Sequence, residues 1–244
     1  MLVKQKVKYI QTLGQKKFRQ EEGLFIAEGP KLVAELLAAT PAAVTEIYAL
    51  KAWAEENKKI LVKAAVTEIT ERELEIISQL TTPNKVLALV KQYDTGIMPV
   101  ANNRITIALD NIQDPGNLGT IIRIADWFGA EQIICSIGSA DVYNPKVVQS
   151  TMGSIARVKV YYTNLEEWLR SQKNIPVYAA SLAGQNVMAM KKVNEAIIII
   201  GNESKGISES VAALATAKIT IPQKGKAESL NAAVAAGIIL SHLV

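Results

Sequence analysis

Three loops in the second half of the sequence combine glycines with polar side chains that can bind or activate a ligand. The first follows the apolar run ITIALD and contains Gly116, Asn117 and Gly119. Glycines let the backbone approach a ligand closely, and free amides at a helix start suit phosphate or carboxylate. Arg123, farther along the helix expected here, can direct a planar set of donors at phosphate. The same residues also fit an ordinary turn in which Asn117 caps the helix and Arg123 is solvated.

The second loop follows the run AIIIIG and places Glu203 between Gly201 and Gly206. A carboxylate at the end of a buried strand can orient a ribose or a neighbouring arginine, and it can equally cap the next helix. A glycine-rich turn with an exposed acid explains the same residues without a ligand. This loop alone therefore assigns no function.

The third loop follows ITIP and leads through a basic, glycine-containing segment to Ser229 and Asn231. Ser229 can be a plain N-cap, and the alanines that follow can be plain close packing. Small residues also permit tight helix–helix contact, as in a dimer. No charged residue occurs after Glu228, so we expect the final helix to be buried against another surface.

Apolar strands that alternate with helices from Ile105 onward position these loops. The expected strands are ITIALD, QIICS, RVKVYY, PVYAAS, AIIIIG and KITIP. The expected helices begin at about Asn117, lie around Asn144 to Ser150 and over NLEEWLRSQ, follow Ser208, and begin at Ser229. Near-continuous apolar strands between helices indicate a parallel sheet covered on both faces. Ligands of such sheets bind beyond the carboxyl ends of the strands, where all three loops lie.

Residues 21–92 predict a smaller α/β unit. Its expected elements are a helix in EGPKLVAELLAA with Pro30 in its first turn, a strand over Val44 to Leu50, a short apolar stretch ending at Ile69, a helix with Thr70 and Glu73 in capping-box spacing, and a strand over Val86 to Gln92. The segment from Tyr93 to Asn103 mixes turn-forming residues and reads as a linker. We therefore expect two domains, residues 1–95 and 104–244.

Positive charge is concentrated at the N-terminus. The formal net charge is +4, and the first twenty residues contain no acid and six basic residues: Lys4, Lys6, Lys8, Lys16, Lys17 and Arg19. The other 224 residues therefore sum to −2. Lysine and arginine bind phosphates by displacing counterions, which suits a polyanion-binding surface. A solvated basic N-terminus explains the same charges.

Composition excludes several classes of protein. A single cysteine, Cys135, rules out an intrachain disulfide and a thiolate cluster for a metal. The N-terminus lacks the apolar region of a signal peptide, and no apolar run is long enough to span a bilayer. Neither a Rossmann nor a Walker glycine pattern occurs, so nucleotide binding does not follow. We expect a cytoplasmic protein without a metal.

The three loops together resemble a known family. PGNLGTIIRIADWFG, IIIIGNESKGIS and IPQKGKAESLNAAVAAGI, in this order, resemble motifs 1, 2 and 3 of the SpoU family, the TrmH-like ribose methyltransferases of the SPOUT superfamily. KFRQEEGLFIAEGPKLVAELL resembles the ribosomal-protein-like, substrate-binding domain that precedes the catalytic domain in many members. Three ordered matches are far more specific than any single loop, and the resemblance covers nearly the whole chain.

The resemblance implies an α/β-knot, a parallel sheet whose C-terminal segment threads a loop as a trefoil knot. Pattern alone predicts an unknotted, doubly wound sheet. The resemblance further implies S-adenosylmethionine-dependent methylation of a ribose 2′-hydroxyl in RNA, more in keeping with ribosomal than transfer RNA, by a homodimer formed through the knot helices. The alternative is a catalytically silent RNA-binding protein of the same fold.

The resemblance also assigns roles to residues. The implied catalytic residues are Arg123, Asn117, Glu203, Ser229 and Asn231. The implied cofactor-binding residues are Ser181, Leu182, Gly201, Asn202, Gly206, Ile221 and Leu230. Arginine stays protonated at neutral pH, so Arg123 is better suited to gripping phosphate and stabilising a developing alkoxide than to removing a proton. The single histidine, His242, lies outside all three motifs, and we expect it to be structural.

Overall fold

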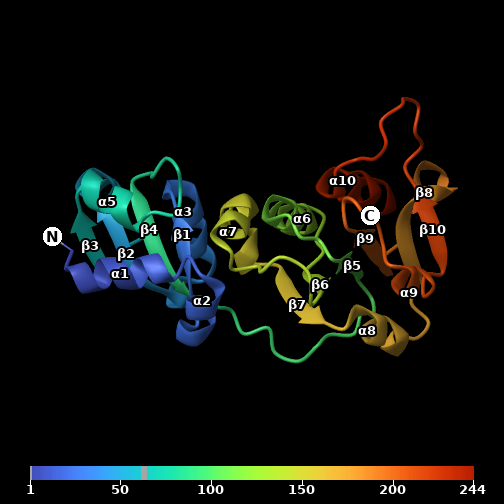
Figure 1. Cartoon of the computed structure of the whole chain (residues 1–244), viewed down its shortest axis with the longest axis horizontal. Coiled ribbons are helices and arrows are strands. Elements are labelled where there is room, and N and C mark those ends of the chain that lie inside the picture. The colour runs from blue at the N-terminus through green and yellow to red at the C-terminus, as the bar shows by residue number, and fades with distance from the viewer. Residues whose placement is uncertain (1, 62–64) are drawn as a thin grey trace. The chain divides into compact units, whose positions relative to one another are not determined.

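The computed structural model describes residues 2–61 and 65–244, which form two compact units. The first contains the chain up to Asp94 together with Asp141–Arg157, and the second contains Thr95–Ala140 and Val158–Val244. Each unit is built around its own sheet (Figure 1). Residues 141–157 come from the stretch expected in the second domain, and the domain boundaries remain a prediction.

The described residues of the first unit form a mixed sheet in the order β1-β4-β2-β3. The strands are β1 (Leu24–Glu28), β2 (Val44–Leu50), β3 (Val66–Ile69) and β4 (Val86–Lys91). β4 runs antiparallel to both β1 and β2, whereas β3 is parallel to β2. The helices are α1 (Lys4–Thr12), α2 (Lys16–Glu22), α3 (Pro30–Ala39), η1 (Pro41–Ala43), α4 (Lys51–Glu56), α5 (Glu71–Ile77), α7 (Pro145–Thr151) and η2 (Ser154–Ala156).

Local sequence signals account for much of this unit. Pro30 begins α3, where a missing N–H costs nothing. The predicted capping box is confirmed at α5: Glu73 N donates to Thr70 Oγ1 over 3.3 Å, and Thr70 N donates to the Glu73 carboxylate over 2.9 Å. Backbone amides of Thr70 and Leu2 lower the pKa of Glu73 to about 2, because they hydrogen-bond its charged form. Buried aliphatic side chains around Tyr48 then pack α1 and α5 on the sheet.

The described residues of the second unit form a sheet in the order β10-β8-β9-β5-β6-β7, in which every adjacent pair of strands is parallel. The strands are β5 (Ile105–Asp110), β6 (Gln132–Ser136), β7 (Lys159–Thr163), β8 (Val177–Asn186), β9 (Ala196–Gly201) and β10 (Ala217–Thr220). The helices are α6 (Pro115–Trp127), α8 (Leu165–Ser171), η3 (Val187–Ala189), α9 (Glu209–Ala212) and α10 (Ala232–Leu243). The predicted α/β class with a parallel sheet is confirmed.

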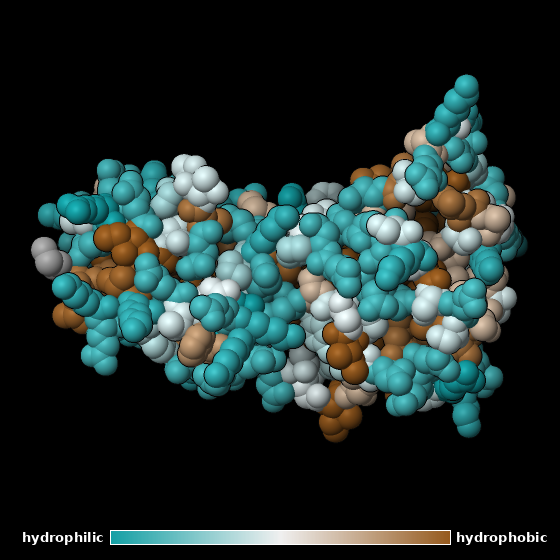
Figure 2. Space-filling model, viewed as in Figure 1, coloured by the Kyte–Doolittle hydropathy of each residue, from teal (hydrophilic) through white to brown (hydrophobic). Residues whose placement is uncertain are grey.

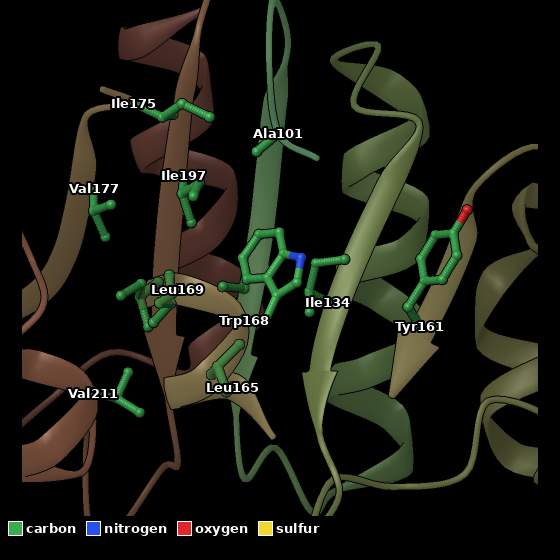
Figure 3. Packing of buried hydrophobic residues seen from close by; sticks show 12 residues of the cluster. Ala101, Ile134, Tyr161, Leu165, Trp168, Leu169, Ile175, Val177, Ile197 and Val211 are labelled. Atoms are coloured by element: carbon green, nitrogen blue, oxygen red, sulfur yellow. The ribbon is translucent and has the colours of Figure 1, made fainter. Parts of the chain in front are cut away.

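Helices cover both faces of the parallel sheet. On one face, Leu165, Trp168 and Leu169 of α8 pack against Ile134 and Ile197 of the central strands (Figure 3). On the other face, α6 and α10 lie side by side, in contact with β6 and β9 respectively. The continuous apolar strands read from the sequence are therefore buried from both sides, as expected for parallel strands.

Two helix starts differ from the sequence prediction. α6 begins at Pro115, not at Asn117, and Asp114 is its cap because the Asp114 side chain accepts from Asn117 N over 2.8 Å. α10 begins at Ala232, and Asn231 caps it by accepting from the amides of Ala233 and Val234. The predicted start at Ser229 is wrong, since the exposed chain from Pro222 to Leu230 stays irregular.

Fewer basic residues of the N-terminal segment are available to bind a polyanion than the count of its charges suggests. Arg19 is only 2% exposed, and its guanidinium donates to Asp141 Oδ2 over 2.6 Å and to the carbonyls of Leu13 and Gly14. Lys6 is bonded to Glu46 over 2.9 Å. Including Arg19 in a polyanion-binding surface was therefore wrong. Its partner, Asp141, lies 122 residues away in the sequence, so the pairing could not be read from neighbouring residues.

Within residues 2–61 and 65–244, none of the helices has the length and apolar character needed to cross a bilayer.

Candidate functional site

The loops after β5, β9 and β10 all leave the parallel sheet at carboxyl ends of strands. β5 and β9 are neighbours in register, and their last residues, Asp110 and Gly201, are paired. Because parallel strands end at the same edge, these loops are brought to one side of the sheet. The motifs found separately in the sequence therefore meet in space.

A chain of side-chain hydrogen bonds joins the three loops. Asn231 Nδ2 donates to Asn117 Oδ1 over 2.8 Å, and Asn117 Nδ2 donates to Glu203 Oε1 over 2.5 Å. Asn117 is thus the centre of the chain, with one partner on each of its polar atoms. The structure brings together three of the five residues predicted to be catalytic.

Helix caps hold two members of this chain in place. Asn231 uses its Oδ1 to cap α10, which leaves its Nδ2 directed at Asn117. Asn117 lies in the first turn of α6, and its backbone amide is held by Asp114. Each asparagine is therefore oriented by a helix start as well as by its neighbour.

A tight hairpin presents Glu203. Asn202 and Gly206 exchange two backbone hydrogen bonds of 3.0 and 2.9 Å, and Asn202 Oδ1 accepts from the amides of Ser204 and Lys205. A Cβ on Gly201 would lie 2.3 Å from the carbonyl carbon of Gly206, so only glycine fits there. The glycines of this loop thus permit the fold of the hairpin itself.

Two residues that sequence reasoning missed anchor this hairpin. Asp110 is 3% exposed and accepts from Ser208 N over 2.8 Å and from Ser208 Oγ over 2.7 Å. Asn111, in a left-handed conformation with φ of 55°, accepts at its carbonyl from Asn202 Nδ2 over 2.8 Å. The signal for Asp110 was available: an acid ends an otherwise apolar strand.

The segment expected to line the cofactor pocket bulges from the sheet. Along β10, Lys218 faces Ala179 and the next residue, Ile219, faces Gln185, so residues 180–184 loop out of β8. Thr220 Oγ1 donates to the carbonyl of Leu182 over 3.1 Å, which places this bulge beside the start of the β10–α10 loop. Ser181 and Leu182 therefore lie near Ile221.

This arrangement fits an adenosyl group. Leu182 and Leu230 are exposed to 75% and 48%, so both apolar side chains are accessible to a ligand. Free backbone groups beside apolar side chains can hydrogen-bond the edge of a purine and cover its faces. The backbone groups and apolar side chains of these loops therefore suit a cofactor that contains a nucleoside.

Two predicted catalytic residues stand apart from the hydrogen-bonded chain. Arg123 is exposed on α6, and its side chain makes no hydrogen bond or ion pair with any part of the chain that the structure describes. It follows Asn117 by six residues, which places it roughly 120° away around the helix. Ser229 is exposed in the β10–α10 loop, which extends from the sheet in Figure 1 and is hydrophilic at its tip in Figure 2.

His242 lies far from these groups. It is in the last turn of α10, where its Nδ1 is 3.0 Å from the carbonyl oxygen of Ile238. Eleven residues separate it from Asn231, a distance of roughly 16 Å along a helix. The hydrogen bond to its own helix is consistent with the structural role predicted for it.

Comparison with known proteins identifies the family. The SpoU rRNA Methylase family matches residues 104–241, and the MRM3-like substrate binding domain matches residues 4–88. The chain belongs to the SpoU rRNA Methylase family. The resemblance inferred from the three motifs is thereby confirmed.

Relatives of this SpoU-family chain match it over nearly its whole length. The 23S rRNA (guanosine(2553)-2'-O)-methyltransferase RlmP of Bacillus subtilis is 31% identical, covering 98% of this chain and 96% of the relative. A TrmH-family protein from Porphyromonas gingivalis is 37% identical with a TM-score of 0.85, covering 99% and 98% of the two chains. An AdoMet-bound rRNA methyltransferase from Sinorhizobium meliloti is 33% identical with a TM-score of 0.84, covering 99% and 95%.

Proposed function

We propose that this SpoU-family protein transfers a methyl group from S-adenosylmethionine to a ribose 2′-hydroxyl of ribosomal RNA. The observation that carries the proposal is the hydrogen-bonded chain of Asn231, Asn117 and Glu203, which joins the three family motifs. Its RlmP relative is named for 2′-O-methylation of 23S rRNA, and the Sinorhizobium relative was solved with AdoMet bound. Both favour ribosomal RNA over transfer RNA as the substrate.

The chemistry is an in-line displacement, for which S-adenosylmethionine supplies the activated methyl group. The 2′-oxygen would form the new bond to the methyl carbon, S-adenosylhomocysteine would leave, and the hydroxyl proton would pass to solvent. The protein must orient the ribose, exclude water and stabilise charge that develops on the attacking oxygen. Arg123 is suited to the last task, because it is a cation without a competing partner among the described residues. Asn117 and Glu203 brace the loop, and Ser229 in the β10–α10 loop and Asn231 at the cap of α10 contact substrate or cofactor.

The cofactor-binding residues that we propose share a position in loops at the carboxyl ends of strands. They are Ser181, Leu182, Gly201, Asn202, Gly206, Ile221 and Leu230. Backbone groups of these loops would hydrogen-bond the adenosyl group, and the exposed side chains of Leu182 and Leu230 would cover its base.

The proposal extends to the fold and the assembly. The C-terminal segment would thread a loop to form the trefoil knot of the family, and two copies would pair through α6 and α10. Two exposed apolar side chains on these helices support the pairing: Trp127 of α6 is 84% exposed and Val234 of α10 is 50% exposed. Residues 1–95 would bind RNA and residues 104–244 would carry out catalysis, in the cytoplasm.

Calorimetric titration of the protein with S-adenosylmethionine tests this function. We expect saturable binding by the wild type and none by Gly201→Ala, because a Cβ there would clash with Gly206. Circular dichroism checks that the variant is folded. Transfer of labelled methyl to bulk ribosomal RNA, followed by nucleoside analysis, should then yield 2′-O-methylated nucleosides. A wild type that binds RNA but not the cofactor would overturn the proposal and favour the catalytically silent RNA-binding protein.

A further inference from the structure

Three exposed lysines lie at one end of the four-strand sheet of the first unit. Lys31 is the second residue of α3, directly after β1, and Lys51 is the first residue of α4, directly after β2. Lys85 immediately precedes β4. None of the three forms an ion pair or a side-chain hydrogen bond within the residues that the structure describes.

Backbone hydrogen bonds hold these lysines close together. Gly29 N donates to the carbonyl of Val86 over 2.8 Å, and Leu50 N donates to the carbonyl of Lys85 over 2.9 Å. β4 lies between β1 and β2 in the sheet (Figure 1). The backbones that carry the lysines are therefore spread over about two interstrand spacings, roughly 10 Å.

Lys85 has a backbone conformation that lysine seldom adopts. Its φ is 59°, in the left-handed region that glycine and asparagine occupy at lower cost. Residues held in such conformations cluster at binding sites, where the side chain has a use that offsets the strain. The exposed side chains of Thr81, Thr82 and Asn84, in the same loop, add hydroxyl and amide groups beside Lys85.

Acidic groups near this end do little to neutralise the lysines. Glu28 ends β1 but is 3% exposed, and its carboxylate accepts from Ser78 Oγ and from Gln79 N. Burial raises the pKa of Glu28, which favours its neutral form. Glu55 and Glu71 are exposed on α4 and α5, and neither is paired with a lysine among the described residues.

The N-terminal helices offer a weaker alternative. Of the six basic residues there, Arg19 is buried against Asp141, Lys6 is bonded to Glu46, and Lys17 lies 3.9 Å from Glu21. The remaining three, Lys4, Lys8 and Lys16, are exposed on two separate helices. They provide a matched set of control lysines in the same unit.

We infer that the sheet end formed by Lys31, Lys51 and Lys85 is the surface through which the first unit binds RNA phosphates. This inference rests on the proposed function, because RNA is the proposed substrate. A lysine ammonium is a point charge and lacks the planar donor set of an arginine guanidinium. It therefore binds the phosphate backbone of RNA whatever the nucleotide sequence. The surface would hold and orient the RNA, leaving selection of the nucleotide to other contacts.

A comparison of two triple variants tests the inference. One carries Lys31→Gln, Lys51→Gln and Lys85→Gln, and the control carries Lys4→Gln, Lys8→Gln and Lys16→Gln. Binding of bulk ribosomal RNA is measured over a series of salt concentrations. For the sheet-end variant, the slope of log affinity against log salt should fall by about 2 to 3, since each phosphate contact contributes roughly 0.7 to 0.9. The control slope should match the wild type.

The methylation assay adds a second readout. At low salt, the sheet-end variant should raise the KM for RNA roughly 30-fold to 100-fold, the product of three lost phosphate contacts of about threefold to fivefold each. The kcat at saturating RNA and the affinity for S-adenosylmethionine should stay unchanged. An unchanged salt slope in the sheet-end variant, or an equal loss in the control, would overturn the inference. A wild type that binds RNA with the expected slope but neither binds the cofactor nor methylates would instead overturn the proposed function.

Lys85→Asn separates binding from backbone strain. Asparagine tolerates the left-handed conformation, so the variant should unfold at the same temperature as the wild type or a higher one. Its affinity for bulk ribosomal RNA should nevertheless fall about threefold to fivefold at low salt, as expected for the loss of one phosphate contact. Unchanged affinity in this stable variant would remove Lys85 from the proposed surface.

Discussion

The six-strand sheet of the second unit and the four-strand sheet of the first unit gather polar groups in different ways. In the parallel sheet all strands end at one edge, so the loops after β5, β9 and β10 deliver Asn117, Glu203 and Asn231 to one another. In the mixed sheet β4 runs against β1 and β2, and β3 is parallel to β2, so one end of the sheet collects three strand exits and one strand entry. Among the described residues, Lys31, Lys51 and Lys85 gather there as unpaired charges, without hydrogen bonds between their side chains.

This difference separates two kinds of function. A site for methyl transfer needs atoms held to within a fraction of an ångström, which interlocked side chains and helix caps provide. A surface for RNA phosphates needs charge at approximately the right spacing, which exposed lysines provide. The two regions should therefore respond differently to substitution: single changes should disable the first, whereas the second should weaken by increments.

The largest effect should come from Arg123→Ala. We expect kcat/KM for RNA methylation to fall roughly 10³-fold, because removal of one group that stabilises transition-state charge has an effect of this order. The fold should be unchanged, since Arg123 is exposed and has no partner among the described residues. Arg170→Ala is the matched control: Arg170 is an exposed arginine of α8, paired with Glu166 over 2.8 Å. Methylation at the wild-type rate by Arg123→Ala would show that the role assigned to Arg123 is wrong.

A smaller effect, on stability, should follow from Arg19→Ala in the first unit. The change leaves Asp141 and the carbonyls of Leu13 and Gly14 without the buried guanidinium, and we expect a loss of about 3 kcal/mol in the free energy of unfolding. Chemical denaturation measures it. Lys17→Ala, which removes an exposed charge, should cost less than about 0.5 kcal/mol. Equal losses in the two variants would contradict the distinction between buried and exposed charges.

The hydrogen-bonded chain offers a test by exchange of donor and acceptor. Asn117→Asp removes the donor to Glu203 and places two carboxylates together, so kcat should fall about 30-fold, or about 2 kcal/mol. Adding Glu203→Gln restores one donor and one acceptor in reversed positions, and it should recover at least part of the rate. If the double variant is as slow as the single one, or slower, Glu203 acts as more than a brace.

Local patterns predicted the elements of the fold well. The strand Val44–Leu50, the strand Gln132–Ser136 and the capping box at Thr70 are each determined by neighbours within a few residues. Helix starts were less predictable, because several candidate caps stood close together. The N-cap of α6 is Asp114, the residue before Pro115, and the N-cap of α10 is Asn231 rather than Ser229.

The candidate site was only partly accessible from sequence. The motifs identified the family and named Asn117, Glu203 and Asn231, but nothing in their spacing showed that Asn117 bonds to both of the others. Asp110 and Asn111 were missed because an anchoring role depends on partners 98 and 91 residues away. The opposite error occurred at Arg19, whose charge was counted as free.

The sequence by itself determined the α/β class, most strands, the capping box at Thr70 and the family, since these depend on hydrophobic period and on motifs of a few residues. Only the tertiary structure decided which polar groups are paired, which are buried and which are left for a ligand. The physical reason is that hydrogen bonds and burial depend on residues far apart in the chain, 86 positions for Asn117 and Glu203 and 122 for Arg19 and Asp141. Lys31, Lys51 and Lys85 became one surface only when strand pairing brought them to the same end of a sheet.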